Sequence, residues 1–211
     1  MNTLRTHSFL TVLLASALTA CGGGGGSSSS GGQPVPGQQS DNNPDNAVTR
    51  AISLNAIEDS RLRQCVSDLQ LRYTSELQIL ECPGQNIASL EGLQQFEQLM
   101  VLNLTDNQIS DLSPIAVLPQ LQYLDMRYNL ISDLSPVSGH KALRSVSLAY
   151  NRITGLVPLS SLTELDSLYV NNNQIQDLSI VATMSGLKAL RADENPAAVP
   201  SDLPAGLAFR I

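Results

Sequence analysis

Residues 99–109 read LMVLNLTDNQI, and this stretch decides the fold because its pattern Leu-x-x-Leu-x-Leu-x-x-Asn-x-Ile returns every 22 residues. A fixed period of this order is the sequence signature of a repeat architecture, in which each repeat is one supersecondary unit. The chain is therefore predicted to be a stack of similar coils. The asparagine of the pattern recurs at Asn107, Asn129, Asn151, Asn173 and Asn195.

Apolar residues fall into four columns when the chain is aligned by this period. The first two columns are separated by one residue, which is typical of a short strand with one buried face. A single coil buries little apolar surface, whereas stacked coils build a continuous core. The columns are Leu80, Leu102, Leu124, Val146, Leu168 and Leu190; Cys82, Leu104, Met126, Leu148, Val170 and Ala192; Ile87, Ile109, Ile131, Ile153 and Ile175; and Leu90, Leu112, Leu134, Leu156 and Leu178.

The repeated pattern is the leucine-rich-repeat signature, and it resembles the 22-residue repeats of the internalin-like group of bacterial leucine-rich-repeat proteins. Residues 109–115 (ISDLSPI) and 131–137 (ISDLSPV) carry the resemblance, from which the fourth repeat departs with Gly155 and the fifth with Ile180. The resemblance covers roughly residues 57–200. It implies an α/β solenoid, a right-handed superhelix with a concave parallel sheet and 3₁₀ turns on the convex side. Such a likeness specifies the fold far better than the partner.

The polar residues of the repeat are expected to serve the turns. An asparagine side chain at the end of a strand can bond the free backbone groups of its own and of adjacent coils. Aspartates recur at equivalent turn positions of different repeats, where we expect local hydrogen bonds and not a shared calcium site. A Ser-Pro pair after the turn suits the N-cap and first position of a short helical turn. These residues are Asp111, Asp133 and Asp177, and the pairs Ser113-Pro114 and Ser135-Pro136.

The open ends of such a stack need covers. A capping helix is predicted before the first repeat from apolar residues spaced i, i+3, i+4 and i+7, and Asp59 or Ser60 suits its N-cap. We assign residues 51–78 to this N-terminal cap region, 79–195 to the repeats and 196–211 to a C-terminal cap. The apolar residues are Leu62, Cys65, Val66 and Leu69 in the helix, and Val199, Leu203 and Leu207 in the C-terminal cap.

The first 20 residues read as the signal peptide of a bacterial lipoprotein. Arg5 supplies the positive charge, and the apolar run over residues 9–18 is too short to span a bilayer, which takes about 20 residues. Residues 18–21 (LTAC) resemble a lipobox, which implies cleavage before Cys21 and acylation of that cysteine. An ordinary signal with a chance cysteine is the alternative. Residues 21–50, rich in Gly, Ser and Pro, then form a flexible tether.

Export across the inner membrane affects two further expectations, the membrane that holds the protein and the oxidation state of its other cysteines. By resemblance to enterobacterial sorting, Gly22 after the cysteine favours the outer membrane, on its periplasmic or its outer side. Cys65 and Cys82 form an even pair in an exported chain, and we expect a disulfide that pins the capping helix to the first coil. Closing a loop of this size stabilises a protein by about 3 kcal/mol. Two small buried thiols are the alternative.

Composition argues against several function classes. The chain has 12 basic and 19 acidic residues, and removal of the signal with Arg5 leaves 11 basic ones. Acidity without a Lys/Arg cluster argues against nucleic acid and anionic lipid head groups as partners. After the signal, His140 is the single histidine, without a nucleophile motif nearby, and neither metal-ligand spacing nor a glycine-rich phosphate loop is found. We therefore predict a monomeric, non-enzymatic protein without cofactor or metal.

Outward strand positions are where a solenoid is expected to bind. Four of the five tyrosines fall at these positions, and tyrosine is favoured at recognition surfaces. A general preference of strands for aromatic residues is the alternative explanation. The candidate partner-binding residues are Tyr123, Asp125, Arg127, Tyr128, Tyr150, Tyr169 and Asn171.

These features together predict an envelope lipoprotein, anchored in a membrane through Cys21, that recognises a protein partner with its concave face. Binding of peptidoglycan or polysaccharide through the same aromatic residues is one alternative. A structural scaffold of the envelope without a small defined site is another.

Overall fold

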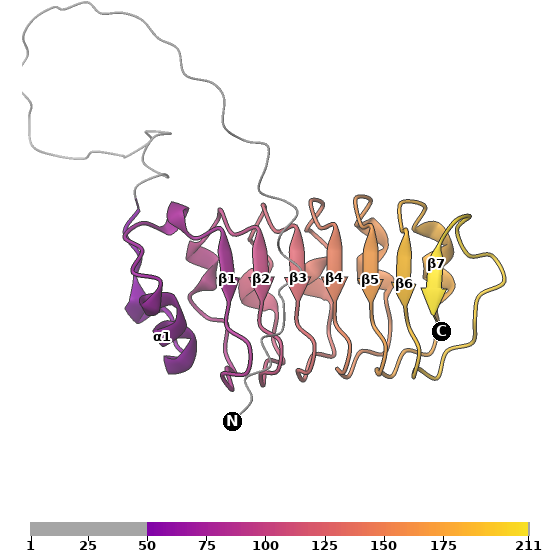
Figure 1. Ribbon diagram of the computed structural model, residues 1–211, viewed down its shortest axis with the longest axis horizontal. Helices are drawn as coiled ribbons and strands as arrows, with labels where there is room; N and C mark the ends of the chain where they lie inside the picture. The colour runs from indigo at the N-terminus through magenta and orange to yellow at the C-terminus, as the bar shows by residue number, and fades with distance from the viewer. Residues whose placement is uncertain (1–49, 211) are drawn as a thin grey trace, which may run out of the picture. The chain divides into compact units, whose positions relative to one another are not determined.

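Seven short parallel strands form one sheet whose order follows the sequence (Figure 1). The computed structural model describes residues 50–210, which belong to the unit Asp41–Ile211. The predicted signal peptide, Cys21 and nearly all of the tether lie outside the described residues. The strands are β1 (Ile79–Glu81), β2 (Val101–Asn103), β3 (Tyr123–Asp125), β4 (Ser145–Ser147), β5 (Ser167–Tyr169), β6 (Ala189–Arg191) and β7 (Ala208–Arg210).

Consecutive strands pair at the period that the sequence predicts. Leu80 of β1 lies opposite Leu102 of β2, and this line of partners continues through every strand to Leu190 of β6. The central residue of each of these six strands is buried and its two neighbours are more exposed. The sheet therefore has one face in the core and one open face, and the predicted solenoid with a parallel sheet is confirmed.

Short 3₁₀ turns run along the opposite side of the coils from the sheet (Figure 1). The turn η8 forms although Ile180 stands where the earlier repeats have proline, so proline favours this turn but is not required for it. The turns that follow β1–β5 are η4 (Leu93–Gln95), η5 (Ser113–Ile115), η6 (Ser135–Val137), η7 (Val157–Ser161) and η8 (Ser179–Thr183); η2 (Leu54–Ala56) and η3 (Thr74–Glu76) precede the first strand.

The N-cap of each of the turns η5, η6 and η8 is a leucine and not the serine, and the aspartate before that leucine accepts the N–H of the first turn residue. Ser113 is the first residue of η5 and its N–H donates to Asp111 Oδ1 at 2.8 Å, which corrects the prediction that the serine is the N-cap. Hydrogen bonds from the serine lower the pKa of each of these aspartates, which therefore remain ionised at neutral pH. Local hydrogen bonding of the recurring aspartates is confirmed. The equivalent pairs are Asp133 with Ser135 and Asp177 with Ser179.

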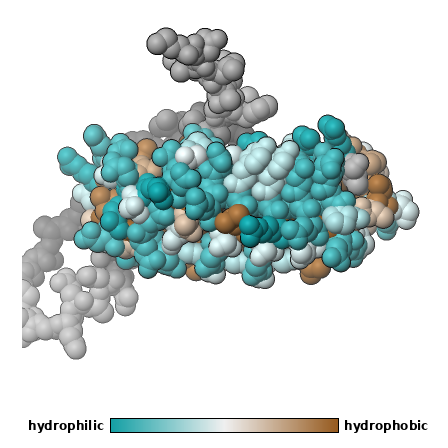
Figure 2. Space-filling view, turned by 90° about the horizontal axis from the view of Figure 1, so that it is seen from below, coloured by the Kyte–Doolittle hydropathy of each residue, from teal (hydrophilic) through white to brown (hydrophobic). Residues whose placement is uncertain are grey.

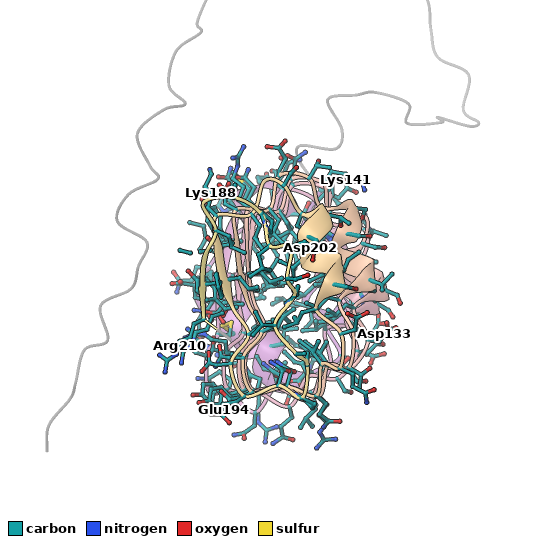
Figure 3. All side chains as sticks on the ribbon, turned by 90° about the vertical axis from the view of Figure 1, so that its right-hand side faces the viewer. Asp133, Lys141, Lys188, Glu194, Asp202 and Arg210 are labelled. Atoms are coloured by element: carbon teal, nitrogen blue, oxygen red, sulfur yellow. A yellow bond between two sulfur atoms is a disulfide. The ribbon has the colours of Figure 1, made fainter. Side chains whose placement is uncertain are left out.

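The core lies between the sheet and the 3₁₀ turns. In the view along the stack, side chains fill this space, with Arg210 and Glu194 on the sheet side and Asp133 on the side of the turns (Figure 3). All residues of the four predicted columns are at most 3% exposed. A continuous core of stacked coils is therefore the main source of stability.

One asparagine in each coil holds the chain where it leaves its strand. The Oδ1 of Asn129 accepts a hydrogen bond from the Ile109 N–H of the preceding coil at 2.9 Å. Its Nδ2 donates to the carbonyl of Leu104 in that coil at 2.9 Å and to Met126 in its own coil at 3.1 Å. The amide thus bonds two coils at once, as predicted. The same bonds are made by Asn107, Asn151, Asn173 and Asn195.

The predicted capping helix is α1 (Ser60–Asp68), and Asp59 is its N-cap. The Asp59 carboxylate accepts hydrogen bonds from Arg61 N–H at 2.8 Å and Leu62 N–H at 3.1 Å. It also accepts one from the Ala88 N–H of the first coil at 2.9 Å, and so joins the cap to the solenoid. Burial raises the pKa of Asp59, but the backbone hydrogen bonds together outweigh this effect and lower its pKa.

A disulfide between Cys65 and Cys82, with Cα atoms 6.3 Å apart, also joins α1 to the first coil, as predicted. The helix buries Leu62 and Val66 against this coil. The side chain of Leu69 is 43% exposed, contrary to the predicted apolar face, because the helix ends one residue before it. The apolar spacing therefore locates the helix correctly and overestimates its length by one residue.

The C-terminal cap contains a strand that the period does not predict. β7 pairs in parallel with β6, and Phe209 lies opposite Leu190, only 19 residues further along the chain. This last coil is three residues shorter than the others, so its residues fall outside the columns. Leu203 and Leu207 pack on the core as predicted, whereas Val199 is 56% exposed.

Replacing the buried amide should strongly destabilise the stack. We expect Asn129→Leu to lower the free energy of unfolding by about 3 kcal/mol or more, since several buried backbone groups lose their partners at about 1–3 kcal/mol each. Asn129→Asp keeps the acceptor for Ile109 but has no donor, so it should lose a large part of this stability. Urea unfolding measured by circular dichroism gives these values. The exposed Gln174→Leu serves as control, and a loss below about 1 kcal/mol for Asn129→Leu would contradict the proposed role.

Candidate functional site

One residue with a left-handed backbone recurs where each coil leaves its strand; it precedes the repeated asparagine in five coils, and in the first coil it is Gly84, which precedes Gln85. The conformation belongs to the coil and not to the residue type, because five residue types share it over six positions. Glu194 marks this row in Figure 3, on the sheet side of the last full coil. The row and its φ angles are Gly84 (67°), Asp106 (59°), Tyr128 (56°), Tyr150 (59°), Asn172 (55°) and Glu194 (58°).

This backbone suits some residues of the row far better than others. Glycine adopts it without steric cost and Asp and Asn tolerate it, which fits Gly84, Asp106 and Asn172. A bulky side chain there costs about 1–2 kcal/mol. Tyr128 and Tyr150 carry this cost in two adjacent coils. Strain at positions where the fold would accept Asn or Gly indicates a role other than stability.

The rings of Tyr128 and Tyr150 stack on each other. Their centroids are 4.2 Å apart, their planes are 12° from parallel, and the residues remain 47% and 43% exposed. Partial desolvation and hydrogen bonding to Tyr150 raise the pKa of the Tyr128 hydroxyl, so it is neutral at physiological pH and can both donate and accept. Such a stack is worth about 0.5–1.5 kcal/mol, which offsets only part of the backbone strain.

Arg127 and Asp125 form a bidentate ion pair beside Tyr128. Arg127 donates to Asp125 Oδ1 through Nε at 2.9 Å and to Oδ2 through Nη2 at 2.8 Å. This pairing raises the pKa of Arg127. The Nη1 group of Arg127 has no hydrogen-bond partner among residues 50–210, so it can donate to a bound molecule.

A second Arg–Asp pair lies two coils beyond Tyr150. Arg191 donates to Asp193 through Nε at 2.8 Å and Nη2 at 3.3 Å. The interaction raises the pKa of Arg191 and lowers that of Asp193, and the charge of Arg191 also interacts with the Tyr150 and Tyr128 hydroxyls. The tyrosine pair is therefore flanked along the stack by two arginines, each held in place by a carboxylate.

The structure brings together only part of the predicted set. Asp125, Arg127, Tyr128 and Tyr150 gather where β3 and β4 end. Tyr123 starts β3 and Tyr169 ends β5; both are half-buried, and within the described residues neither ring stacks on the pair.

Asn171 lies differently from the prediction that it belongs to the exposed surface. It is 4% exposed, and its Nδ2 donates to Asn172 Oδ1 at 2.8 Å. The equivalent Ala149 is also buried, at 3% exposed. The strand ends at Tyr169, and beyond it the alternation of inward and outward positions no longer holds. We therefore exclude Asn171 from the candidate surface.

Sequence reasoning overlooks Arg191 and Asp193. They occupy the same columns as Asp125 and Arg127 three coils earlier, with acid and base in reverse order. A search for charged residues two apart within equivalent columns would have found both pairs. Their relation to the tyrosines depends on the stacking of coils and so needs the structure.

The histidine that acid–base catalysis would need is buried in the scaffold. His140 is 2% exposed, and its ring nitrogens lie 2.9 Å from the Ile115 carbonyl and 3.2 Å from the Val137 carbonyl. Among the described residues, no group of three or more His, Cys, Asp and Glu side chains could hold a metal ion. In the same part of the chain, no helix has the length and hydropathy of a membrane span.

Comparison with known proteins agrees with this architecture. The family model described as Leucine Rich repeats (2 copies) matches residues 97–139 and 141–183. The fold is a leucine-rich-repeat solenoid. A search of curated proteins gave no match to this leucine-rich-repeat chain.

Two solved leucine-rich-repeat structures are similar to this chain. One is an internalin from Listeria monocytogenes, with 28% identity and a TM-score of 0.67, covering 71% of this chain and 47% of that one. The other is a leucine-rich-repeat protein from Leptospira interrogans, with 26% identity and a TM-score of 0.55, covering 60% and 35%. The chain thus spans about half or less of the length of these relatives.

Replacing both tyrosines by the residue that the row favours should not destabilise the leucine-rich-repeat fold. We expect the free energy of unfolding of the double variant Tyr128→Asn/Tyr150→Asn to equal that of the native chain or to exceed it by up to about 2 kcal/mol. The reason is that the relief of backbone strain exceeds the lost stacking energy. Urea unfolding measures the difference. The reciprocal Asn172→Tyr should lose stability in the same row. A loss above about 1 kcal/mol in the double variant would mean that the pair is structural.

Proposed function

We propose that this leucine-rich-repeat protein recognises a protein partner through the open face of its sheet, at a site centred on Tyr128 and Tyr150. The observation that carries the proposal is the pair itself, two exposed aromatic side chains at positions whose backbone disfavours them. Tyrosine buries a large apolar surface and keeps a polar tip, which is why it is enriched at binding hot spots.

The dimensions of the site suit a protein surface. Neighbouring strands are about 4.8 Å apart, so the four coils from β3 to β6 span about 15 Å. A cluster of this width fits within a standard interface, which buries about 800 Å² on each partner. The Nη1 groups of Arg127 and Arg191 add donors of fixed direction on both flanks, suited to carbonyl or carboxylate oxygens.

The charges at the site nearly balance. Arg127 pairs with Asp125, and Asp193 pairs with Arg191 and, at 3.9 Å, with Arg210. The side of the molecule drawn in Figure 2 is mainly hydrophilic, with small and separate hydrophobic areas. These features favour a partner held by a few buried contacts over one attracted from a distance by charge.

A glycan is the second candidate ligand, because the exposed tyrosine rings have the polar Asn172 in the next coil and Asp125 in the coil of Tyr128. Peptidoglycan or polysaccharide would use the same rings, so the test below must separate the two classes. An envelope scaffold without a defined site predicts that no position on this face has a special effect.

The binding site can be tested by photo-crosslinking in intact cells with the full chain. We expect p-benzoylphenylalanine in place of Tyr128 to give a defined protein adduct, and the same group in place of the exposed Val157 on the other side of the coils to give none. With the identified partner purified, Tyr128→Asn/Tyr150→Asn should weaken binding about 30-fold or more, the effect of a hot spot of about 2 kcal/mol.

The outcomes separate the candidates. A glycan fragment captured at Tyr128 would favour the second ligand class. Equal capture from both positions, or unchanged affinity of the double variant, would contradict a site at the tyrosine pair. The double variant is a clean probe because its expected stability is not below that of the native chain.

We further propose that the protein is held at a membrane of the bacterial envelope, the outer membrane being favoured, by acyl chains on Cys21. The support is the lipobox-like sequence of residues 18–21 after a short apolar run, followed by a tether rich in Gly and Ser. Several acyl chains on one residue anchor a protein stably, where one chain does not.

Removing the acceptor thiol should release the protein from the membrane. We expect Cys21→Ala to move the chain from the membrane pellet to the soluble fraction, or to leave it with an uncleaved signal. Metabolic labelling with palmitate should mark the native chain and not this variant. Cys65→Ala/Cys82→Ala is the matched control, since it removes two other cysteines. Unchanged labelling of Cys21→Ala would contradict the anchor.

A further inference from the structure

The stacked phenol rings of Tyr128 and Tyr150 also constitute a chemical site. We propose that these two residues are a site of oxidative coupling, at which a one-electron oxidant joins them through a carbon–carbon bond into an intramolecular dityrosine. The oxidant class is a peroxide acting through a haem peroxidase. The inference shares its residues with the proposed recognition site but requires no partner.

The fold keeps the two rings together and open to solvent. Their centroids are 4.2 Å apart, and close to half of each residue is exposed. The Tyr128 N–H donates to the Ala149 carbonyl at 3.0 Å, and the Asn129 N–H donates to the Tyr150 carbonyl at 3.3 Å. These hydrogen bonds hold the backbones of the two coils together, while each exposed ring can reorient rapidly about its side-chain bonds.

Each coupling consumes one molecule of hydrogen peroxide. Each phenol loses a proton and an electron from its hydroxyl and becomes a phenoxyl radical, whose unpaired electron spreads to the ring carbons ortho to the oxygen. Two ortho carbons form one bond, and the hydrogen on each of them moves to its oxygen and restores the phenol. The protein loses two hydrogen atoms in total, and one hydrogen peroxide is reduced to two waters.

Proximity decides which tyrosines couple. Radicals on separate molecules must meet by diffusion, whereas Tyr128 and Tyr150 are already in contact, so coupling between them is effectively unimolecular. Desolvation and the interaction with Tyr150 raise the pKa of the Tyr128 hydroxyl more than the charges of Arg127 and Arg191 lower it, so proximity and not acidity selects this pair.

The other tyrosines provide controls within the same molecule. Tyr73 is 40% exposed, so access alone does not distinguish it from the pair. Among residues 50–210 the stacked contact joins Tyr128 and Tyr150, and Tyr73, Tyr123 and Tyr169 take no part in it. If exposure were sufficient, Tyr73 would couple between molecules as readily as the pair couples within one.

The test is oxidation of the purified chain, with its disulfide intact, by peroxidase and hydrogen peroxide. We expect a monomer that lacks two hydrogen atoms and shows dityrosine fluorescence, with a yield independent of protein concentration. Trypsin places the tyrosines in four separate peptides, so a linked pair is identified by its mass. The expected product joins peptide 128–141 to peptide 145–152; the other two peptides are 73–127, with Tyr73 and Tyr123, and 153–188, with Tyr169.

Matched variants complete the test. Tyr150→Phe keeps an aromatic ring in the stack but has no hydroxyl to oxidise, so it should abolish the link. Tyr169→Phe should retain it at the native yield. Links between other peptides, or yields that rise with concentration and give dimers, would overturn the proposal, as would an uncoupled pair under conditions that couple a free tyrosine peptide. None of these outcomes tests partner recognition, which is measured separately by the affinity of Tyr128→Asn/Tyr150→Asn.

Discussion

The hydrogen bonds of the buried asparagine amides are the constraint on which the rest of the structure depends. Where each coil leaves its strand, backbone groups of two coils would be buried without partners, and one amide satisfies them. The residue before each of these asparagines has a left-handed backbone. The row that carries Tyr128 and Tyr150 is therefore a by-product of the scaffold, available for recognition because its side chains point away from the core.

The period predicts whatever repeats from coil to coil. The four core columns, the strand register and the bonding of the asparagines all follow from one 22-residue alignment, because equivalent positions meet equivalent neighbours in consecutive coils. Features that occur once are harder to predict. β7 escapes the alignment because its coil is shorter, and Asn171 turns inward because strand alternation has already ended there.

The sequence predicts which tyrosines belong to the candidate site, but it does not predict how they are arranged. Counting tyrosines at outward positions finds Tyr128 and Tyr150, yet their stacking and their strained backbone require coordinates. Arg191 is 41 residues away from Tyr150 in sequence and two coils away in the stack. Stability and recognition thus compete in a single row, where Gly84 and Asn172 satisfy the fold and the tyrosines do not.

The two ends of the solenoid are closed unequally. The first coil is held by α1, by the Cys65–Cys82 disulfide and by Asp59, whereas the last coil is short and ends in β7, whose three residues are all exposed. In a stack where each coil is supported only by its neighbours, opening starts where that support is weakest. We therefore expect fraying to proceed inward from the β7 edge, and the coils of β3 and β4 that carry the tyrosine pair to exchange their amide hydrogens late.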